Sequence, residues 1–424
     1  MRTRRQRGVI MILSYVVITF LLALTMAGFQ RTTVELASSQ QSVQTLQAFH
    51  NAEAGLDRGL DWLRTQPSPP SGTLAFNPPL TGPQTLGGGQ YTVTIDPDDS
   101  NPTSYLDLYA ITAIGQPTTA GIRRTVTGLY RTESFARFAY FTTSERLPDG
   151  TRIWFSSNDR LYGPVHSNDQ LNIAGSPAFF GPVSSAAATI NYRTPPPVGG
   201  NNPQFSGGLQ LRAATMTLPT SVTALRVAAS SGGAWYEGPT TITLQANGTM
   251  LVTNAARGWV NVSRPLPGNG AIFVNGGNAV VSGMLKGQVT IGTSANLMIT
   301  NHLRYATDPV TTPQSTDLLG LLAEQNVIVS QSAPNDLTIQ GSIMALQTSF
   351  SVENWWQGSP RGLLNLYGGV IQNTRGAVGS ISGTTGQLLT GYAKNYQYDQ
   401  RFSSLAPPFF PTTGRYEAVL WQEN

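Results

Sequence analysis

The chain opens with a short basic stretch that runs directly into a long apolar segment. Four arginines lie within the first seven residues, and the 21 residues 9–29 carry no charge. A bilayer core about 30 Å thick needs about 20 apolar residues in a helix, so this run is long enough to span it. A cleaved secretory signal has a shorter apolar core of about 7–15 residues. The run therefore predicts a transmembrane segment over residues 9–29, although hydropathy alone fits a plain signal anchor equally well.

The helical pattern continues beyond the apolar run. Between Arg31 and Arg64 there is no proline, and glycine occurs only at Gly55 and Gly59. Apolar residues recur there at intervals of three, four and seven, which is the period of a helix: Val43, Leu46, Phe49, Leu56, Leu60 and Leu63. We therefore predict one helix from residue 9 to residue 65, whose second part (30–65) is an amphipathic arm.

These segments carry a resemblance to a known family. The order RQRG, an apolar span and QRTTVELASSQQSVQTLQAFHNAEAGLDRGL resembles the N-terminal region of PilX-type minor pilins of type IV pili. The resemblance implies a leader, residues 1–8, that a prepilin peptidase cuts between Gly8 and Val9, followed by methylation of the new N-terminus. It also implies a subunit that spans the inner membrane once before assembly. Its helix would later pack against other pilins, with the head periplasmic and then extracellular.

The chain departs from the pilin pattern at one position. Most pilins carry Glu at the fifth mature position, which is Leu13 here. In the family that carboxylate is thought to neutralise the N-terminal amine of the subunit ahead, and a buried unpaired charge is costly. A subunit with no neighbour ahead has no amine to neutralise, so Leu13 suits a place at the filament tip. The alternative is that this subfamily simply tolerates the loss.

Residues 66–134 have the pattern of a pilin β-sheet domain. A proline- and glycine-rich stretch, residues 65–89, predicts a connecting loop. Runs rich in β-formers follow at 90–95, 104–115 and 122–131 and predict three antiparallel strands. The acidic residues of Asp96–Asn101 suggest a calcium loop, but they lack the ligand spacing of an EF-hand, so a solvated turn is the preferred interpretation.

Residues 135–411 are too many for a pilin head, and internal matches suggest what they form. Residues 160–168 match residues 178–186 at an offset of 18, and residues 337–345 match residues 364–372 at an offset of 27. Residues 279–292 have the same glycine-centred apolar alternation. Short strands at such spacing predict the stacked rungs of an irregular β-solenoid. A β-sandwich is the alternative.

The C-terminal residues 412–424 alternate again and predict a strand that returns to the pilin sheet. The predicted fold class is therefore α+β: a long N-terminal helix with an antiparallel pilin sheet, and a large all-β domain inserted into it. This architecture resembles the ComZ-type competence pilin, a tip-located minor pilin with an inserted β-solenoid. In that type the implied function is binding of extracellular DNA for uptake.

Catalytic and metal-binding patterns are weak in this sequence. There is no cysteine, so disulfides and cysteine-based sites are excluded. The three histidines, His50, His166 and His302, lie far apart and lack paired metal-ligand spacing. We expect no enzyme activity, no cofactor and no bound metal, and we interpret His166 as a turn residue rather than a base. Acids in the predicted solenoid are sparse and isolated in the sequence, and they include Asp159, Asp169, Glu237, Asp308, Asp317, Glu324, Asp336, Glu353 and Asp399.

The charge distribution favours a polyanionic ligand. Removal of the four leader arginines leaves 26 − 4 = 22 basic side chains against 22 acidic ones. Residues 170–307 nevertheless hold a single acid, Glu237, so they carry a local basic excess that suits phosphate binding. The candidate DNA-binding cations are Arg193, Arg212, Arg226, Arg257, Arg264, Lys286 and Arg304. The candidate base-stacking aromatics are Tyr192, Trp235, Tyr236 and Trp259.

Three functions remain open at this point. The preferred hypothesis is a minor pilin at or near the pilus tip whose solenoid binds extracellular DNA for natural transformation. The second is a structural or adhesive minor pilin that primes assembly or attaches to surfaces. The third is a membrane-tethered solenoid polysaccharide hydrolase.

Overall fold

The computed structural model describes residues 3–66, 74–75, 83–97, 105–118, 121–382 and 387–423. They fall into two compact units, which are described separately. The helix–sheet unit comprises the described residues within 1–99, 107–131 and 416–424. The coil unit comprises those within 100–106 and 132–415.

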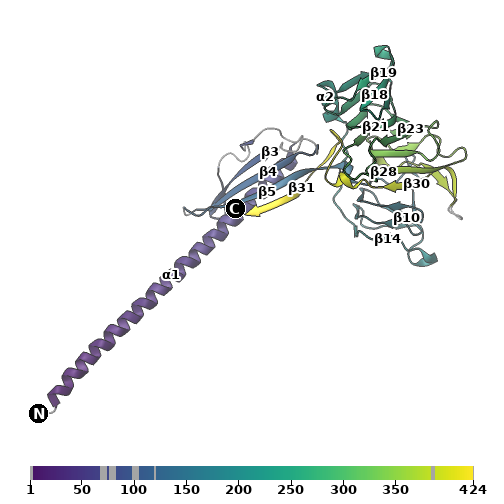
Figure 1. Ribbon diagram of the computed structural model, residues 1–424. Coiled ribbons are helices and arrows are strands. Elements are labelled where there is room, and N and C mark those ends of the chain that lie inside the picture. Colours follow the sequence, from purple (N-terminus) through teal and green to yellow (C-terminus); the bar gives the residue numbers. More distant parts are fainter. Residues whose placement is uncertain are drawn as a thin grey trace. The chain divides into compact units, whose positions relative to one another are not determined.

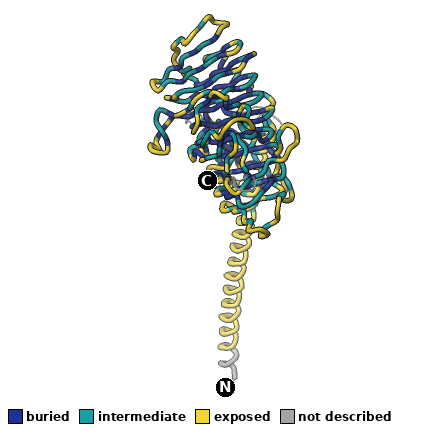
Figure 2. Tube along the Cα trace, turned by 90° about the vertical axis from the view of Figure 1, so that its right-hand side faces the viewer, coloured by how far each residue is buried: buried dark blue, intermediate teal, exposed yellow. Residues whose placement is uncertain are grey.

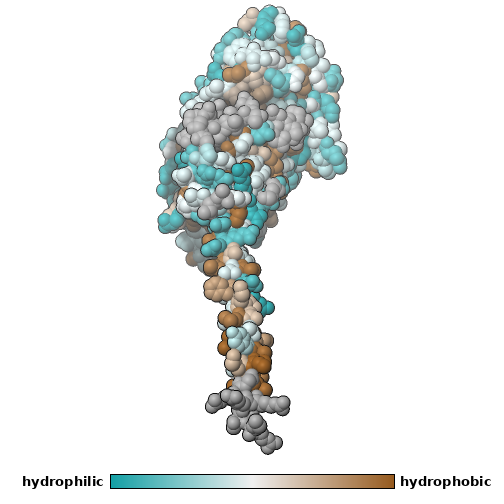
Figure 3. Space-filling view, turned by 90° about the vertical axis from the view of Figure 1, so that its left-hand side faces the viewer, coloured by the Kyte–Doolittle hydropathy of each residue, from teal (hydrophilic) through white to brown (hydrophobic). Residues whose placement is uncertain are grey.

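One helix, α1 (Thr3–Thr65), runs through the N-terminal part of the helix–sheet unit, which confirms the predicted continuous helix (Figure 1). All residues from 9 to 43 are exposed, and Ala48 is the first buried residue along it. Figure 2 shows this exposed stretch, and Figure 3 shows hydrophobic side chains gathered on it. Within the described part of the chain it is the one helix long and apolar enough to cross a membrane.

An antiparallel sheet covers the second part of α1. Its strands are β1 (Leu74–Ala75), β2 (Gln84–Leu86), β3 (Gly89–Pro97), β4 (Leu108–Pro117), β5 (Arg124–Ser134) and β31 (Thr412–Glu423). The order is β1-β3-β4-β5-β31, with β2 also paired to β3. The three strands β3, β4 and β5 are those predicted, and the α+β class is confirmed. The short strands β1 and β2 lie where we expected only loop. Within the predicted acidic turn, residues 98–101 lie outside the described residues.

The core of the helix–sheet unit follows from the helical period of α1 and the two-residue alternation of the strands. Leu56 and Leu63 on α1 pack against inward-facing residues of β3 and β4, such as Ile95 and Ile111. Burying each of these side chains contributes about 1.5–3 kcal/mol. Close approach requires glycine at Gly115, where a Cβ would lie 2.0 Å from the Ala48 carbonyl oxygen. The apolar stripe is shorter than predicted, because two of its members remain exposed, namely Val43 and Leu46.

The coil unit contains one helix, α2 (Thr223–Ser230), four short 3-10 helices and many short strands in its described part. The strands are β6 (Tyr140–Ser144), β7 (Phe155–Ser156), β8 (Arg160–Leu161), β9 (Val165–Ser167), β10 (Asn172–Ala174), β11 (Ala178–Phe179), β12 (Val183–Ser185), β13 (Asn191–Tyr192), β14 (Gln204–Phe205), β15 (Leu209–Gln210), β16 (Ala234–Glu237), β17 (Thr240–Leu244), β18 (Thr249–Asn254), β19 (Trp259–Pro265), β20 (Ala271–Asn275), β21 (Ala279–Leu285), β22 (Gln288–Thr293), β23 (Leu297–Tyr305), β24 (Leu318–Ala323), β25 (Val327–Val329), β26 (Thr338–Ala345), β27 (Phe350–Val352), β28 (Pro360–Thr374), β29 (Gly379–Ile381) and β30 (Leu388–Gln397).

Most of these strands pair in parallel with a strand one turn of chain away. His166 on β9 pairs with Ser184 on β12, and Ala345 on β26 pairs with Gln372 on β28. These pairs have the offsets of 18 and 27 found in the sequence, so both internal matches are confirmed as stacked strands. Parallel pairing differs from the antiparallel strands of a β-sandwich. The antiparallel exceptions are β17–β18–β19 and β29–β30.

The stack consists of two segments that meet in its middle. From β6 the chain stacks outward through β9 and β12 to β15. It then crosses to the opposite end and returns through β16, β20, β22, β24 and β26 to β28. Strand β28 pairs in parallel with β6, which joins residues 370–374 to residues 140–144. Apolar side chains from successive turns pack together in the interior. Figure 2 shows the buried residues along the stacked strands in dark blue.

Candidate functional site

Several predicted ligand-binding residues converge at the β16 end of the coil unit. Strand β18 is followed by a short 3-10 turn, Ala255–Arg257, and Gly258, with φ of 65°, turns the chain into β19. Arg257 and Arg264 are exposed, whereas Trp259 is half-buried. Figure 1 shows β18 and β19 at one end of the stack and β10 and β14 at the other. We call Tyr236, Arg257, Trp259 and Arg264 the arginine–tryptophan cluster. The ring of Trp235, another candidate aromatic, points to the other face of β16 and stacks on Phe273 at 5.2 Å.

Cation–π contacts hold this cluster together. The guanidinium groups of Arg257 and Arg264 each lie 5.1 Å from the centroid of the Trp259 ring. Arg257 also lies 5.4 Å from the Tyr236 ring and donates a 2.7 Å hydrogen bond to the Trp235 main-chain oxygen. Each such contact is worth about 0.5–1 kcal/mol at exposed sites. The two cations are therefore held beside one indole, and both arginines remain exposed.

A bend in β19 places Arg264 beside Trp259. The two residues are five apart, so regular alternation would direct their side chains to opposite faces. Asn261 between them adopts a φ of 52°, and the pairing of β18 with β19 shifts register beside it. The Asn261 main-chain nitrogen donates to the Thr253 hydroxyl at 2.9 Å. This irregularity brings both side chains to one face, an arrangement that spacing alone does not predict.

The pKa values of Tyr236 and Glu237 are shifted in opposite directions at this site. Burial raises the pKa of Tyr236 while Arg257 and Arg264 oppose the shift. Hydrogen bonds from Trp235 and Asn275 lower the pKa of Glu237, so this carboxylate stays ionised beside the cluster. Two exposed cations beside the Trp259 indole suit a phosphate with an adjacent base. The guanidinium planes themselves offer stacking surfaces where they cover Trp259.

The other candidate cations do not join this cluster. Arg226 forms an ion pair with Glu324 at 2.8 Å and lies over Phe273 at 4.7 Å. Lys286 lies 3.6 Å from Asp317, and Arg304 donates a long 3.4 Å hydrogen bond to Thr338.

The remaining candidates belong to the first stack segment. Tyr192 ends β13, and Arg193 follows it. Arg212 lies beyond β15 and has a φ of 57°. The strand order puts these residues at the end opposite β16, so the seven cations do not form one surface.

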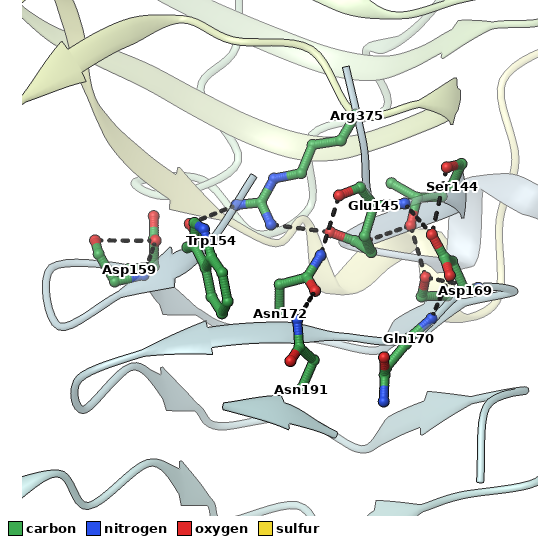
Figure 4. Close-up of polar contacts among 12 residues, drawn as sticks. Ser144, Glu145, Trp154, Asp159, Asp169, Gln170, Asn172, Asn191 and Arg375 are labelled. Carbon is green, nitrogen blue, oxygen red and sulfur yellow. Dashed lines mark hydrogen bonds and ion pairs between the residues drawn. The ribbon is translucent and has the colours of Figure 1, made fainter. Parts of the chain in front are cut away.

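A buried polar cluster lies where β6 and β28 meet (Figure 4). Arg375 Nη1 lies 2.9 Å from Glu145 Oε2, and their side chains are 1% and 0% exposed. Arg375 also lies 3.8 Å from the Phe155 ring centroid. Lys394 lies 3.3 Å from Asp159. Asp159, which is isolated in the sequence, is therefore part of a buried charge network.

The pKa shifts in this cluster reflect competition between burial and pairing. Burial tends to raise the pKa of Asp159, but Lys394, Arg375 and a hydrogen bond from Ser156 together lower it. Burial likewise opposes protonation of Arg375, yet Tyr140, Glu145 and Asp159 together raise its pKa. All four charged groups have partners. A structural role in joining the two stack segments is therefore sufficient to explain this network.

His166 lies in the interior rather than at a turn, which corrects our interpretation. It is on β9, 1% exposed, with Ser184 at 2.7 Å and Asn168 at 3.0 Å from its ring nitrogens. Burial lowers its pKa. Among the residues that the structure describes, no three His, Cys, Asp or Glu side chains are grouped as metal ligands.

Both residues of the predicted cleavage site lie within α1. Val9 is exposed, and Gly8 falls inside the bounds of the helix. No geometric feature of the helix marks a cut there, so this site remains a prediction from the sequence.

The comparisons with known proteins assign no role to these residues. The family model described as "Domain of unknown function (DUF4900)" matches residues 104–188. No curated protein matches. Among solved structures, the chain is similar to the competence-associated pilin ComZ from Thermus thermophilus, with 12% identity and a TM-score of 0.35. That alignment covers 90% of this chain and 98% of the other. At this TM-score the likeness carries no argument, and the proposals below depend on the residues of this chain.

Proposed function

We propose that this chain is a minor pilin of a type IV pilus, located at or near the tip. The observation that carries the proposal is the division of α1. Residues 9–43 are apolar in their first half and wholly exposed, whereas the end of the same helix is covered by an antiparallel sheet. An exposed apolar helix needs lipid or neighbouring helices around it. A membrane first and other pilin helices later would meet this need in turn.

Processing of the N-terminus tests this proposal. Mass spectrometry of the protein from its native cells is expected to find a methylated N-terminus at Val9. Gly8→Leu is expected to block processing. Gly28→Ala is the matched control, because a Cβ at Gly28 meets no atom within 4 Å. A mature protein that retains Met1 would leave an ordinary membrane anchor and contradict the pilin assignment.

We propose extracellular DNA as the ligand of the coil unit, bound at the arginine–tryptophan cluster. Phosphate neutralisation by arginine gives affinity that is independent of base sequence, and aromatic or guanidinium planes can stack on exposed bases. The cluster supplies both from one end of the stack, and neither arginine forms an ion pair with any carboxylate among the residues that the structure describes.

Salt titration of DNA binding tests this ligand. The full-length protein in detergent is titrated with labelled single-stranded DNA at several salt concentrations, and binding is followed by fluorescence anisotropy. Arg257→Gln with Arg264→Gln is expected to reduce the slope of log affinity against log salt by about 1.4, since each lost phosphate contact to a single strand contributes about 0.7. The control, Arg146→Gln with Arg152→Gln, removes the same charge from exposed positions elsewhere in the coil unit.

The outcomes separate the competing functions. Absence of DNA binding even at low salt removes the DNA part and leaves the pilin assignment in place. A structural or adhesive pilin predicts a partner whose binding persists at high salt. Turnover of a polysaccharide would instead favour the tethered hydrolase.

A further inference from the structure

A groove lies on one face of the coil unit, between its stacked strands and a segment that crosses them. Its volume is about 560 Å³, inside the range of roughly 300–1,000 Å³ typical of small-ligand sites. The crossing segment, residues 211–222, joins β15 to α2, and we call it the strap. The groove includes no residue of the arginine–tryptophan cluster, so it is a separate site and is independent of the proposed function.

The strap is fixed on both sides of the groove. The Asn168 side-chain amide donates to the Met216 main-chain oxygen at 2.6 Å and accepts from its nitrogen at 3.0 Å. The Val222 nitrogen donates to Glu324 at 3.4 Å. Between these points, residues 217–220 make no backbone hydrogen bond to any other described residue. Their main-chain carbonyl groups, and the N–H groups of the residues other than Pro219, are therefore available to a ligand.

The floor of the groove carries two pairs of polar side chains from successive turns of the stack. Thr143 and Asn373 directly follow the paired residues Thr142 and Gln372 of β6 and β28. Gln325 and Gln347 lie two positions after the paired residues Ala323 and Ala345 of β24 and β26. Neighbouring parallel strands lie about 4.7–4.9 Å apart, so the two members of each pair have about that spacing. Within the described part of the chain, the side-chain amides of Gln325 and Gln347 have no hydrogen-bond partner.

The lining has little free charge. Glu324 is the single charged residue among the described residues that line the groove. Its two oxygens accept from Arg226 at 3.0 and 2.8 Å. An anionic ligand would find no unpaired cation here, and a cationic ligand would have to displace Arg226. The chemistry therefore favours a neutral ligand.

We propose that this groove binds a neutral oligosaccharide chain. Amides and hydroxyls supply donors and acceptors in comparable number, as sugar hydroxyls require. Leu346, Met216 and Leu218 also line the groove and offer apolar contact to the C–H faces of sugar rings. The spacing within each pair is close to the length of one pyranose unit in an extended glycan. The chain would lie across the stacked strands beneath the strap.

Glycan binding by the full-length protein tests this inference. The protein is kept in a detergent without a sugar headgroup, because a glycosidic detergent would compete. Short neutral oligomers of glucose, N-acetylglucosamine, galactose and mannose are titrated by calorimetry. Gln325→Ala with Gln347→Ala is expected to weaken binding of the preferred oligomer at least about tenfold. The control, Gln210→Ala, removes an exposed amide of β15 outside the groove.

Each result decides for or against the site. Binding of one oligomer series that is insensitive to salt and lost in the double variant supports the groove. Binding of none of the series overturns the inference, as does binding that the double variant retains. Saturable binding of neutral extended peptides in place of sugars also overturns it. DNA binding at the arginine–tryptophan cluster is unaffected by any of these outcomes.

Discussion

Replacing Arg375 by methionine removes the buried cation of the β6–β28 junction while keeping most of the side-chain volume. Glu145 is 0% exposed, and loss of Arg375 would leave the Thr142 hydroxyl as its side-chain donor. Removing one partner of a buried ion pair typically costs about 3–5 kcal/mol. Since domains are stable by about 5–15 kcal/mol, Arg375→Met is expected to lose a large fraction of the free energy of unfolding.

The same structure predicts that removing both charges is less harmful than removing one. In the double variant Glu145→Leu with Arg375→Met, no charge of the pair remains buried alone. Replacement of a buried pair by apolar residues of similar volume is often neutral or stabilising by about 1–4 kcal/mol. The loss in the double variant is therefore expected to be smaller than the sum of the two single losses.

Denaturant unfolding of the full-length protein, followed by tryptophan fluorescence, measures these losses. Hydrogen exchange then locates them, with residues 140–144 and 370–374 expected to lose protection in Arg375→Met. The exposed Arg146 provides the control, and Arg146→Met is expected to change stability by less than about 0.5 kcal/mol. A loss below about 1 kcal/mol in Arg375→Met, or additive losses in the double variant, would refute the junction as described.

Two further predictions concern one residue of each unit. Burial lowers the pKa of His166, so the unfolded chain gains its proton first and stability falls as pH drops below about 6.5, by up to about 1.4 kcal/mol per pH unit. His166→Gln should remove this part of the pH dependence of the free energy of unfolding, measured with denaturant. His50→Gln, at an exposed helical position, should leave it unchanged. An unchanged pH dependence in His166→Gln would contradict the buried, neutral state of His166. Gly115→Ala would place a Cβ 2.0 Å from the Ala48 oxygen and should raise exchange of amides in β3 and β4, and unaltered exchange there would contradict the close packing.

The N-terminal helix and the three main sheet strands could be predicted from the sequence because both depend on local pattern. Absence of proline between Arg31 and Arg64 and a sustained helical period were sufficient for α1. The exposure of Val43 and Leu46 could not be predicted, because it depends on where the sheet stops covering the helix. Strands β1 and β2 are too short to show a period within a proline-rich stretch.

The stacked strands were partly visible in the sequence. Two internal matches, at offsets of 18 and 27, correspond to pairs of neighbouring strands. The junction between β6 and β28 joins residues 230 apart, as in Arg375 and Glu145, and no local pattern carries such a contact. For the same reason Asp159 was interpreted as isolated.

The arginine–tryptophan cluster could be predicted only in part from the sequence. A local basic excess with aromatics selects residues 170–307 as a candidate binding region. It could not separate Arg257 and Arg264 from Arg226, because pairing of Arg226 with Glu324 depends on the fold. A sharper signal would have been Asn261 between Trp259 and Arg264, since asparagine tolerates positive φ and marks a possible irregularity in a strand.

Immunogold electron microscopy of pili tests the central claim most directly. Antibodies against the coil unit are applied to cells that are making pili and to pili sheared from them. A minor pilin at the tip predicts gold particles on filaments, concentrated at one end and retained after shearing. Label confined to the cell membrane, with bare filaments in the same field, would contradict the account.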